Sequence, residues 1–483
     1  MANQAMNLLV IVSDQHNKRV TGCYGDSLVQ TPNLDRLAQE GVVFDNAYTP
    51  CPICMPARAC MATGVYAHQG RFWDNVHAYD GQLPSFGKLL TDSGVEVTTI
   101  GKLHFKNDSP KTGFEKQIIP LHSKNGIGEP AQCLRNGGII KPQQKKGILN
   151  AGPGNTDYIE YDREVTRHVE DFLENKGRSR ENDKPWLLHV GFVNPHPPHK
   201  APPEYYDYYR DIPIPPPNQY SLGERPMHLV LEGIRRFNDL QDAFDSKTVL
   251  KMQRTYYAKV SYLDAQIGRI LKSLKENGLA ANTRILYISD HGDNLGNHGL
   301  WFKQTMYEES AGVPMIMAGP DIPKGERRKT IVNLIDVFGA ILSCFNVGSA
   351  SDDLLWEIGR SHEIPGRIAF SEFHCCGAYE DIYMIRSERY KYVYYHHNAP
   401  QLFDMELDPY ELNDLANAPS YQEIIKLHHQ ILTEILDPDE VDRECRADQE
   451  KVINMFGGRE NFDENAFWKG IGSPIPSEFL NKD

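Results

Sequence analysis

Asn7-Leu-Leu-Val-Ile-Val-Ser-Asp14 is a short, continuous apolar run that ends in a carboxylate. A run without alternation of apolar and polar residues is typical of a strand that is buried on both faces of a parallel sheet. Similar runs recur at residues 97–100, 186–193 and 285–289, and polar or glycine residues follow each of them. Helical periodicity lies between the runs, most clearly over residues 248–277. This alternation predicts an α/β fold in which helices cover both faces of a parallel or mixed sheet.

The texture of the sequence divides the chain into three parts. Residues 1–365 carry the alternation of strands and helices and form the predicted main domain. Residues 366–436 contain short strand-like runs followed by a helical pattern, which predicts a smaller C-terminal α+β subdomain. Residues 437–483 are charged and weakly periodic, and we expect a C-terminal tail that is a candidate contact for a homo-oligomer. The Gly- or Pro-rich segments 123–153 and 211–226 are expected to be loops that border a functional site.

Composition and charge exclude several classes of protein. Lys and Arg number 51 against 65 Asp and Glu, so the net charge is −14, which argues against binding to a nucleic-acid backbone. No apolar run approaches the ~20 residues needed to cross a bilayer, so we expect no membrane partner. Residues 1–7 lack the basic region of a signal peptide. The sequence therefore predicts a cytoplasmic protein, or a periplasmic or secreted one if a signal peptide has been removed.

The nine cysteines are an odd number in a long chain, which fits reduced thiols better than a disulfide framework. Cys51-Pro-Ile-Cys54 has the spacing of a zinc or redox motif. A zinc ribbon needs a second pair at similar spacing, and only the adjacent Cys375-Cys376 is available. We therefore look to a different chemistry for this segment.

Cys54-Met-Pro-Ala-Arg58 carries the strongest chemical signal in the chain. It resembles the C-x-P-x-R signature of the type I sulfatases, the formylglycine-dependent members of the alkaline-phosphatase-like superfamily. Other segments resemble the family in the expected order: Ser13-Asp14-Gln15, Gly101-Lys-Leu-His104, Pro195-His196-Pro197 and Ser289-Asp-His-Gly-Asp-Asn-Leu-Gly-Asn-His-Gly-Leu-Trp-Phe-Lys303. The resemblance covers residues 6–415 and is nearest to the choline-sulfatase and phosphonate monoester hydrolase branch. It implies an alkaline-phosphatase-like α/β fold, in which a large mixed sheet is sandwiched by helices and residues 1–365 are the catalytic sulfatase domain.

The resemblance also implies a nucleophile and a metal ion. Cys54 would be oxidised to formylglycine by a formylglycine-generating maturation enzyme, with the catalytic Arg58 one helical turn away. One divalent ion is expected, Ca²⁺ in the first place and Mg²⁺ or Mn²⁺ as alternatives. Its expected ligands are Asp14, Gln15, Cys54, Asp290 and His291. Gln15 and His291 stand where many members carry Asp and Asn, so the sequence leaves the identity of the metal open.

The remaining candidate residues would act on the sulfate ester. Lys102 and Lys303 would clamp the sulfate oxygens in the transition state, and Asn75 is a further candidate sulfate contact. By the resemblance, His104 would assist the diol or its breakdown, and His196 would protonate or stabilise the leaving oxygen. Lys102 and His104 are two residues apart, so an extended segment would place both side chains on one side.

Three functions are compatible with these residues. The leading hypothesis is an enzyme, a sulfuric ester hydrolase that acts on an aryl, sugar or small alkyl sulfate. Its partner would then be a small-molecule or saccharide sulfate ester. The alternative is a phosphonate monoester or phosphodiester hydrolase on the same scaffold, but that branch often carries uncharged residues at positions matching Lys102, His104 and Lys303. A non-catalytic anion- or glycan-binding relative would be expected to lose Cys54 or a metal carboxylate. The organic part of the substrate is left open.

Overall fold

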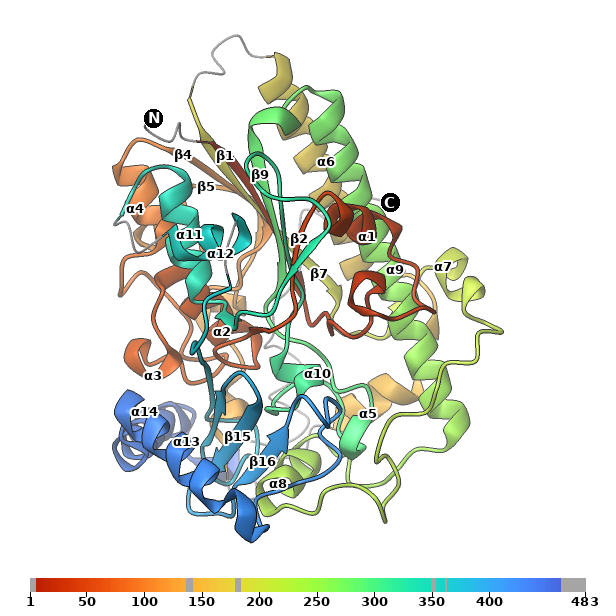
Figure 1. Cartoon of the computed structure of the whole chain (residues 1–483), viewed down its shortest axis with the longest axis vertical. Coiled ribbons are helices and arrows are strands. Elements are labelled where there is room, and N and C mark those ends of the chain that lie inside the picture. The colour runs from red at the N-terminus through yellow and green to blue at the C-terminus, as the bar shows by residue number, and fades with distance from the viewer. Residues whose placement is uncertain (1–5, 136–141, 179–183, 349–352, 361–362, 462–483) are drawn as a thin grey trace.

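The computed structural model describes residues 6–135, 142–178, 184–348, 353–360 and 363–461. Its centre is an eight-stranded sheet in the order β11-β2-β10-β9-β1-β7-β4-β5 (Figure 1). The strands are β1 (Asn7–Asp14), β2 (Gly41–Phe44), β4 (Glu96–Lys102), β5 (Lys116–Leu121), β7 (Trp186–Pro195), β9 (Thr283–Ser289), β10 (Met315–Ala318) and β11 (Glu326–Arg328). Strand β10 runs antiparallel to both of its neighbours, whereas the other pairings are parallel. The sheet is therefore mixed, as predicted.

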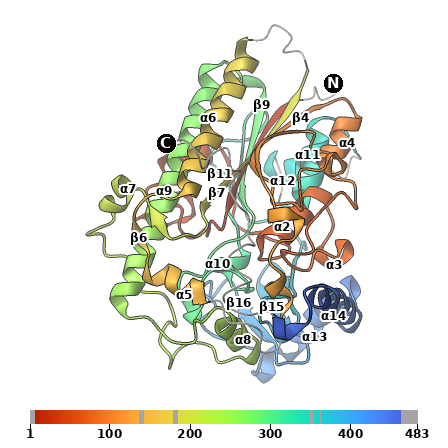
Figure 2. The same cartoon turned by 180° about the vertical axis from the view of Figure 1, so that it is seen from behind.

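Helices cover both faces of this sheet because its central strands are apolar on both sides. Leu8 and Val10 of β1 pack into one core, whereas Leu9 and Ile11 pack into the other. One face is covered by α2 (Cys54–Thr63), α4 (Phe86–Asp92), α11 (Asp336–Cys344) and α12 (Leu354–Arg360). The other face is covered by α1 (Pro32–Gln39), α6 (Asp157–Arg178) and α9 (Ser246–Glu276). Figures 1 and 2 show the two helical layers on either side of the sheet. The predicted helix over 248–277 is confirmed as α9.

A small antiparallel sheet forms the C-terminal subdomain. Its strands are β13 (Ala369–Phe373), β14 (Ile382–Arg386), β15 (Tyr390–Tyr395) and β16 (Gln401–Asp404), each paired with the next. Alternate residues of β14 face opposite ways: Met384 packs into the core of the large domain, and Tyr383 packs into a smaller core. That smaller core includes Leu432 of α13 (Gln422–Ile435) and Cys445 of α14 (Pro438–Met455). The predicted α+β subdomain is thus confirmed.

Helix α14 lies in the segment whose weak periodicity suggested a tail. Its buried face mixes Val441, Cys445 and Ile453 with the polar Gln449, and most of its other residues are charged. The Gln449 amide donates hydrogen bonds to the carbonyl of His374 (2.9 Å) and to Asp74 Oδ2 (3.1 Å). Residues 438–455 are therefore attached to the body of the protein. The self-association contact is predicted on residues 437–483, and residues 462–483 of that segment lie outside the described residues.

The two segments expected to be loops differ from each other. Residues 211–226, all of which the structure describes, contain no helix or strand. The segment 123–153 instead holds α5 (Pro142–Leu149), because Ile148 is buried in a small core, and the short strand β6 (Gly152–Pro153). Residues 136–141 of this segment lie outside the described residues. The remaining short elements are β3 (Ala47–Tyr48), β8 (Lys200–Ala201), β12 (Val332–Asn333), α3 (Ala67–Gly70), α7 (Pro203–Tyr208), α8 (Leu229–Phe237) and α10 (Glu308–Ala311).

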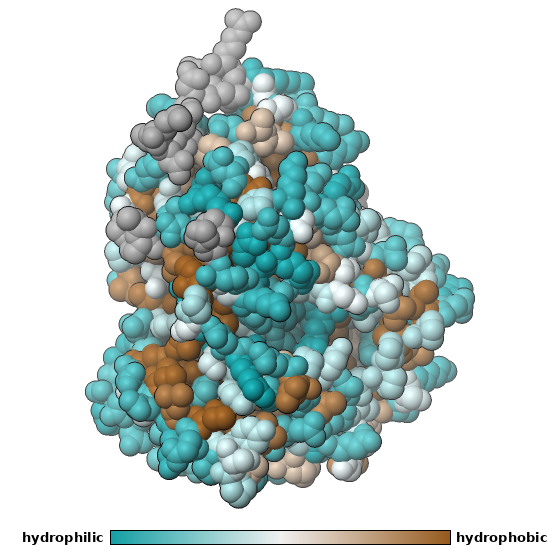
Figure 3. Space-filling view, viewed as in Figure 1, coloured by the Kyte–Doolittle hydropathy of each residue, from teal (hydrophilic) through white to brown (hydrophobic). Residues whose placement is uncertain are grey.

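The surface in Figure 3 is mostly hydrophilic, and its most hydrophobic area lies at the lower left, where Figure 1 places the C-terminal subdomain. Among the described helices, none combines the length and the apolar character that a bilayer crossing requires.

Candidate active site

The candidate residues meet at the carboxyl ends of the central parallel strands. Asp14 and Lys102 are the last residues of β1 and β4, and Asp290 directly follows β9. His196 directly follows β7, and Cys54 is the first residue of α2. Figures 1 and 2 both place α2 between this end of the sheet and the C-terminal subdomain. The site therefore lies where open α/β sheets bind their ligands.

Helix α2 holds Cys54 at its N-terminus. Ile53, at the N-cap, offers no side-chain cap, and Asn75 Oδ1 instead accepts a hydrogen bond from the backbone N–H of Met55 at 3.1 Å. The helix ends at Gly64, which adopts φ 73°. All ten residues of α2 are buried, so Cys54 is fixed by packing on every side of the helix. Asn75, a predicted sulfate contact, thus lies beside the start of α2, and its side chain accepts from the backbone of this helix.

Two carboxylates and two cations form the floor of the site. Arg58 Nε donates to Asp290 Oδ2 at 2.7 Å, and its Nη2 lies 3.6 Å from Asp14 Oδ2. Arg58 Nη1 also donates to the Lys102 carbonyl at 2.9 Å, so this guanidinium holds the carboxylates in place. The Lys102 ammonium contacts Asp14 Oδ2. Burial alone would raise the pKa of Asp14, but Lys102, His196, Lys303 and Arg58 together hold it well below its usual range. Asp14 is therefore an anion.

Three groups surround the sulfur of Cys54. Lys303 Nζ lies 2.9 Å away, His291 Nε2 3.3 Å away and Asp14 Oδ1 3.8 Å away. Burial and the Asp14 charge raise the pKa of the Cys54 thiol to about 11. The unmodified thiol is therefore protonated at neutral pH and is a poor nucleophile. This sulfur occupies the position that a side-chain oxygen would take after oxidation of the residue.

Gln15 connects Lys303, the cation beside Cys54, to the carboxylates. It adopts φ 68°, and its backbone N–H donates to Asp290 Oδ1 at 3.1 Å. Its carboxamide oxygen accepts from Lys303 at 2.9 Å, and its Nε2 donates to Asp293 Oδ2 at 2.6 Å. The Tyr256 hydroxyl in turn donates to the Gln15 carbonyl at 2.5 Å. Gln15 therefore lies beside the site, with its side chain held by hydrogen bonds.

The donor set fits a divalent ion. One ligand atom from each of Asp14, Cys54, Asp290 and His291 lies within 4.8 Å of all the others, and all four residues are buried. Two carboxylates suit hard cations such as Ca²⁺ or Mg²⁺, and the imidazole extends the range to Mn²⁺. Burial lowers the pKa of His291 to about 4, so the imidazole is neutral, as a metal ligand must be.

The two other predicted histidines are both near this floor. Burial is the main cause that holds the pKa of His104 and of His196 well below the usual range, and Lys102 adds to the effect in both. His196 Nδ1 lies 2.8 Å from the Pro197 carbonyl, which makes it the protonated nitrogen. His104 adopts φ 62°, and β4 ends at Lys102, so residues 102–104 are not extended as the spacing argument assumed.

The sequence reasoning missed two residues that shape the site. Asp293 holds Gln15, and it lies within the Ser289–Lys303 segment, where only Asp290, His291 and Lys303 were singled out. Tyr256 lies on the buried face of α9, where the helical pattern predicts core packing, yet its hydroxyl also accepts from the backbone N–H of Asn17 at 2.8 Å. The sequence could have indicated Asp293, because it is an acidic residue only three positions after the candidate ligand Asp290. It could not have indicated a tyrosine on a distant helix.

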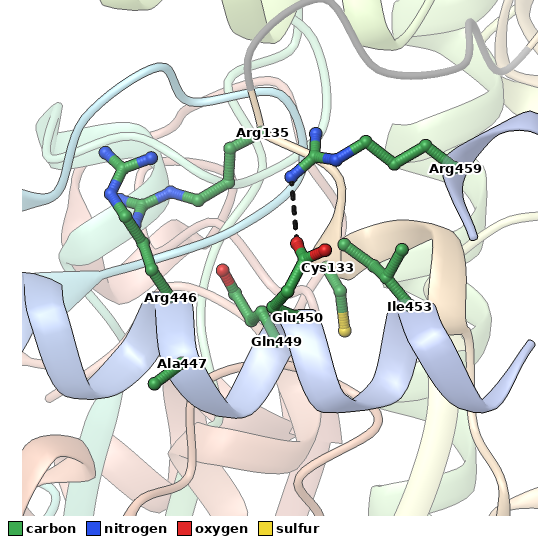
Figure 4. Close-up of a pocket in the computed structure, with 8 residues that line it drawn as sticks. All are labelled: Cys133, Arg135, Arg446, Ala447, Gln449, Glu450, Ile453 and Arg459. Carbon is green, nitrogen blue, oxygen red and sulfur yellow. Dashed lines mark hydrogen bonds and ion pairs between the residues drawn. The ribbon is translucent and has the colours of Figure 1, made fainter.

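A separate cavity of about 300 Å³ lies beside α14 (Figure 4). It contains three arginines, which would attract an anion if they were unpaired. Arg459 pairs with Glu450 at 3.3 Å. Arg135 pairs with Asp381 and Asp442, and Arg446 pairs with Glu380 and Asp442. Because its cations are neutralised, this cavity is a poorer anion site than the strand ends.

The chain is similar to proteins of known kind over most of its length. The family model described as Sulfatase matches residues 6–347, and one described as N-sulphoglucosamine sulphohydrolase, C-terminal, matches residues 296–437. A choline-sulfatase of Rhizobium meliloti (strain 1021) is 32% identical over 433 residues, which cover 86% of this chain and 83% of the relative.

Two solved structures share the fold. One is a complex with its substrate D-glucosamine-2-N,6-O-disulfate; its TM-score is 0.69 at 23% identity, over 93% of this chain and 99% of that one. The other is a phosphonate monoester hydrolase of Agrobacterium radiobacter, with a TM-score of 0.69 at 23% identity, over 98% of this chain and 100% of that one.

Proposed function

The chain belongs to the sulfatase family and is a sulfuric ester hydrolase, and we propose that it hydrolyses its ester with a nucleophile made from Cys54 and one divalent ion. The observation that carries this proposal is the position of the Cys54 sulfur, at the N-terminus of α2 and 2.9 Å from the Lys303 ammonium. Asp14 and His291 approach the same atom. A nucleophile, an anion-binding cation and a metal donor set thus converge on one point.

Oxidation of Cys54 to formylglycine by a maturation enzyme would supply a hydroxyl nucleophile from its hydrate, and the ion would polarise the sulfuryl oxygens and lower the pKa of this hydroxyl. Asp14, Asp290, His291 and the oxygen of residue 54 would hold the ion, and Gln15 would complete the set. Ca²⁺, Mg²⁺ and Mn²⁺ are the candidates. Arg58 keeps both carboxylates in position through its contacts with Asp290 and Asp14.

The sulfate group would bind between the ammonium groups of Lys303 and Lys102. Lys303 reaches the reacting atom directly, whereas Lys102 reaches it through Asp14. Both are preorganised, so they stabilise charge that develops on the sulfuryl oxygens without rearranging. The first N–H groups of α2 favour an anion at the same place, and Asn75 anchors one of them. His104 would assist the proton transfers at residue 54.

His196 would protonate the leaving oxygen. In the free enzyme its pKa is low because of burial and of the nearby Lys303 and Lys102 charges. A bound sulfate ester carries a negative charge that offsets these cations, so the imidazole can hold a second proton when it is needed. The Pro197 carbonyl accepts from Nδ1, which leaves Nε2 for the substrate.

The substrate class is an aryl, sugar or small alkyl sulfate, and the phosphonate monoester reaction on the same fold is the alternative. Lys102, His104 and Lys303, which all lie around the site, favour sulfate. The test is kcat/KM for 4-nitrophenyl sulfate, choline sulfate, a glucosamine sulfate and a 4-nitrophenyl phosphonate ester, with Cys54→Ala as the control. We expect the best sulfate ester to exceed the phosphonate ester, and no turnover by the control. A higher value for the phosphonate ester would support the alternative.

A further inference from the structure

The segment that carries His196 is held by charged side chains from two helices. Asp162 of α6 is fully buried, and its carboxylate accepts hydrogen bonds from the backbone N–H groups of Val193 and Asn194, each at 2.9 Å. It also accepts from the side-chain amide of Asn194 at 2.6 Å. This one carboxylate therefore binds the donors of the segment at the point where β7 ends.

Lys259 of α9 binds the acceptors of the same segment. Its side chain is 2% exposed, and its ammonium donates to the carbonyls of His196 and of Pro198, the latter at 2.8 Å. These two carbonyls flank Pro197, whose own carbonyl is 2.8 Å from His196 Nδ1. Fixing the carbonyls on either side of Pro197 therefore fixes the acceptor that orients the imidazole.

The burial of these two ionisable groups costs more desolvation free energy than a purely structural turn requires. Burial lowers the pKa of Lys259 to about 7, although Asp162 partly offsets the effect, and burial raises the pKa of Asp162 to about 6. Neutral groups could satisfy a turn at a lower desolvation cost. Two buried charged groups directed at one short segment are expected where the position of a side chain on that segment must be accurate.

We propose that Lys259 is a positioning residue for His196: its ammonium fixes the carbonyls of His196 and Pro198, and thereby places the imidazole at the leaving oxygen. The proposal rests on the proposed function, because it assigns Lys259 to the acid step of sulfate-ester hydrolysis. It predicts that loss of Lys259 is felt only where protonation of the leaving group matters.

The test is Lys259→Met, which removes the ammonium and keeps the length of the side chain. We expect kcat/KM for an unactivated alkyl sulfate to fall by about 10–100-fold and that for 4-nitrophenyl sulfate to fall by less than about 3-fold. In the double variant with His196→Ala, Lys259→Met should lower kcat/KM no further. Lys251→Met is the matched control, because Lys251 lies on the same helix and donates to a carbonyl far from His196, that of Leu149 (2.7 Å). It should leave both rates unchanged.

Equal losses on both esters, or losses that multiply with His196→Ala, would overturn the proposal and make Lys259 a merely structural residue. If Lys259→Met does not fold, Lys259→Arg keeps the cation with an altered geometry, and it should again lose more on the alkyl than on the nitrophenyl ester. Equal losses by this variant would also overturn the proposal. Failure of the proposed function looks different, because Cys54→Ala would then keep its turnover, or the unsubstituted enzyme would hydrolyse the phosphonate ester faster than either sulfate ester.

Discussion

His291 Nε2 lies 3.3 Å from Cys54 Sγ, and the same nitrogen is 3.7 Å from Asp290 Oδ1 and 4.0 Å from Asp14 Oδ1. The imidazole of His291 thus faces both carboxylates and Cys54. Its other nitrogen, Nδ1, donates to the Gly292 carbonyl at 3.1 Å, which fixes the tautomer so that Nε2 is unprotonated and its lone pair is available to a metal ion. This relationship joins the candidate metal centre to the candidate nucleophile.

Asp290→Asn is expected to lower both metal occupancy and turnover. A hard, charged ligand becomes neutral, and Arg58 loses the charge of one of its two carboxylate partners, so the apparent metal affinity should fall by at least about 10-fold. Elemental analysis after dialysis, together with activity before and after a chelator, measures both effects. Asp211→Asn, at an exposed position of the 211–226 segment, is the control. A chelator-resistant enzyme without a stoichiometric divalent ion would rule out the metal centre.

Lys303→Ala is expected to slow the hydrolysis of every sulfate ester. The Lys303 ammonium lies 2.9 Å from the sulfur of Cys54, the proposed nucleophile, and is held by Gln15. Its loss therefore removes a preorganised donor to the charge that develops in the transition state. We predict a fall in kcat of about 10²–10³, whatever the leaving group. A loss that appears only in KM would show that Lys303 binds the ground state and the transition state equally.

The effect of His196→Ala on kcat/KM should depend on the leaving group of the substrate. An acid matters most for a basic alkoxide, so kcat/KM for an alkyl or sugar sulfate should fall by about 10²–10⁴. The nitrophenolate of 4-nitrophenyl sulfate is already stable, so its rate should change by less than about 10-fold. Equal losses for both esters would make His196 a binding residue.

Lys391→Met is expected to destabilise the fold through the contact between the large domain and the C-terminal subdomain. Lys391 is fully buried on β15 and lies 2.7 Å from Glu308 of α10 and 2.8 Å from Glu411. Its removal leaves buried carboxylates with fewer partners, so the free energy of unfolding should fall by about 3 kcal/mol. Urea denaturation measures the change. The exposed Lys426–Glu423 pair is the control, because Lys426→Met should cost less than about 0.5 kcal/mol. Equal effects of the two substitutions would contradict this account of the contact.

The apolar runs predicted the fold correctly because each is long enough to be buried on both sides of a sheet. Such runs also locate the ends of β1 and β9, where Asp14 and Asp290 lie. The strands β2, β10 and β11, which form one side of the large sheet, have only three or four residues, and their pairing depends on contacts across the whole chain. Residue spacing therefore could not show where the single antiparallel strand would fall.

Individual contacts in the site were less predictable than its members. Arg58 was expected beside the nucleophile, and its hydrogen bonds go to Asp290 and to the Lys102 carbonyl. Lys259 contacts backbone carbonyls. Every residue has a backbone carbonyl, so a sequence motif does not indicate such a contact. Helix α14 was missed because polar Gln449 interrupts its apolar stripe.

The state of Cys54 decides the central claim most directly. Oxidation of the thiol to an aldehyde lowers the mass of its peptide by roughly 18 Da, and hydration restores it. Mass spectrometry of the peptide that contains Cys54, taken from a preparation with measured sulfate-ester turnover, should show this loss in proportion to activity. Cys54→Ala should be folded and inactive. Full turnover by protein that contains only the unmodified thiol, or by Cys54→Ala, would contradict the formylglycine mechanism.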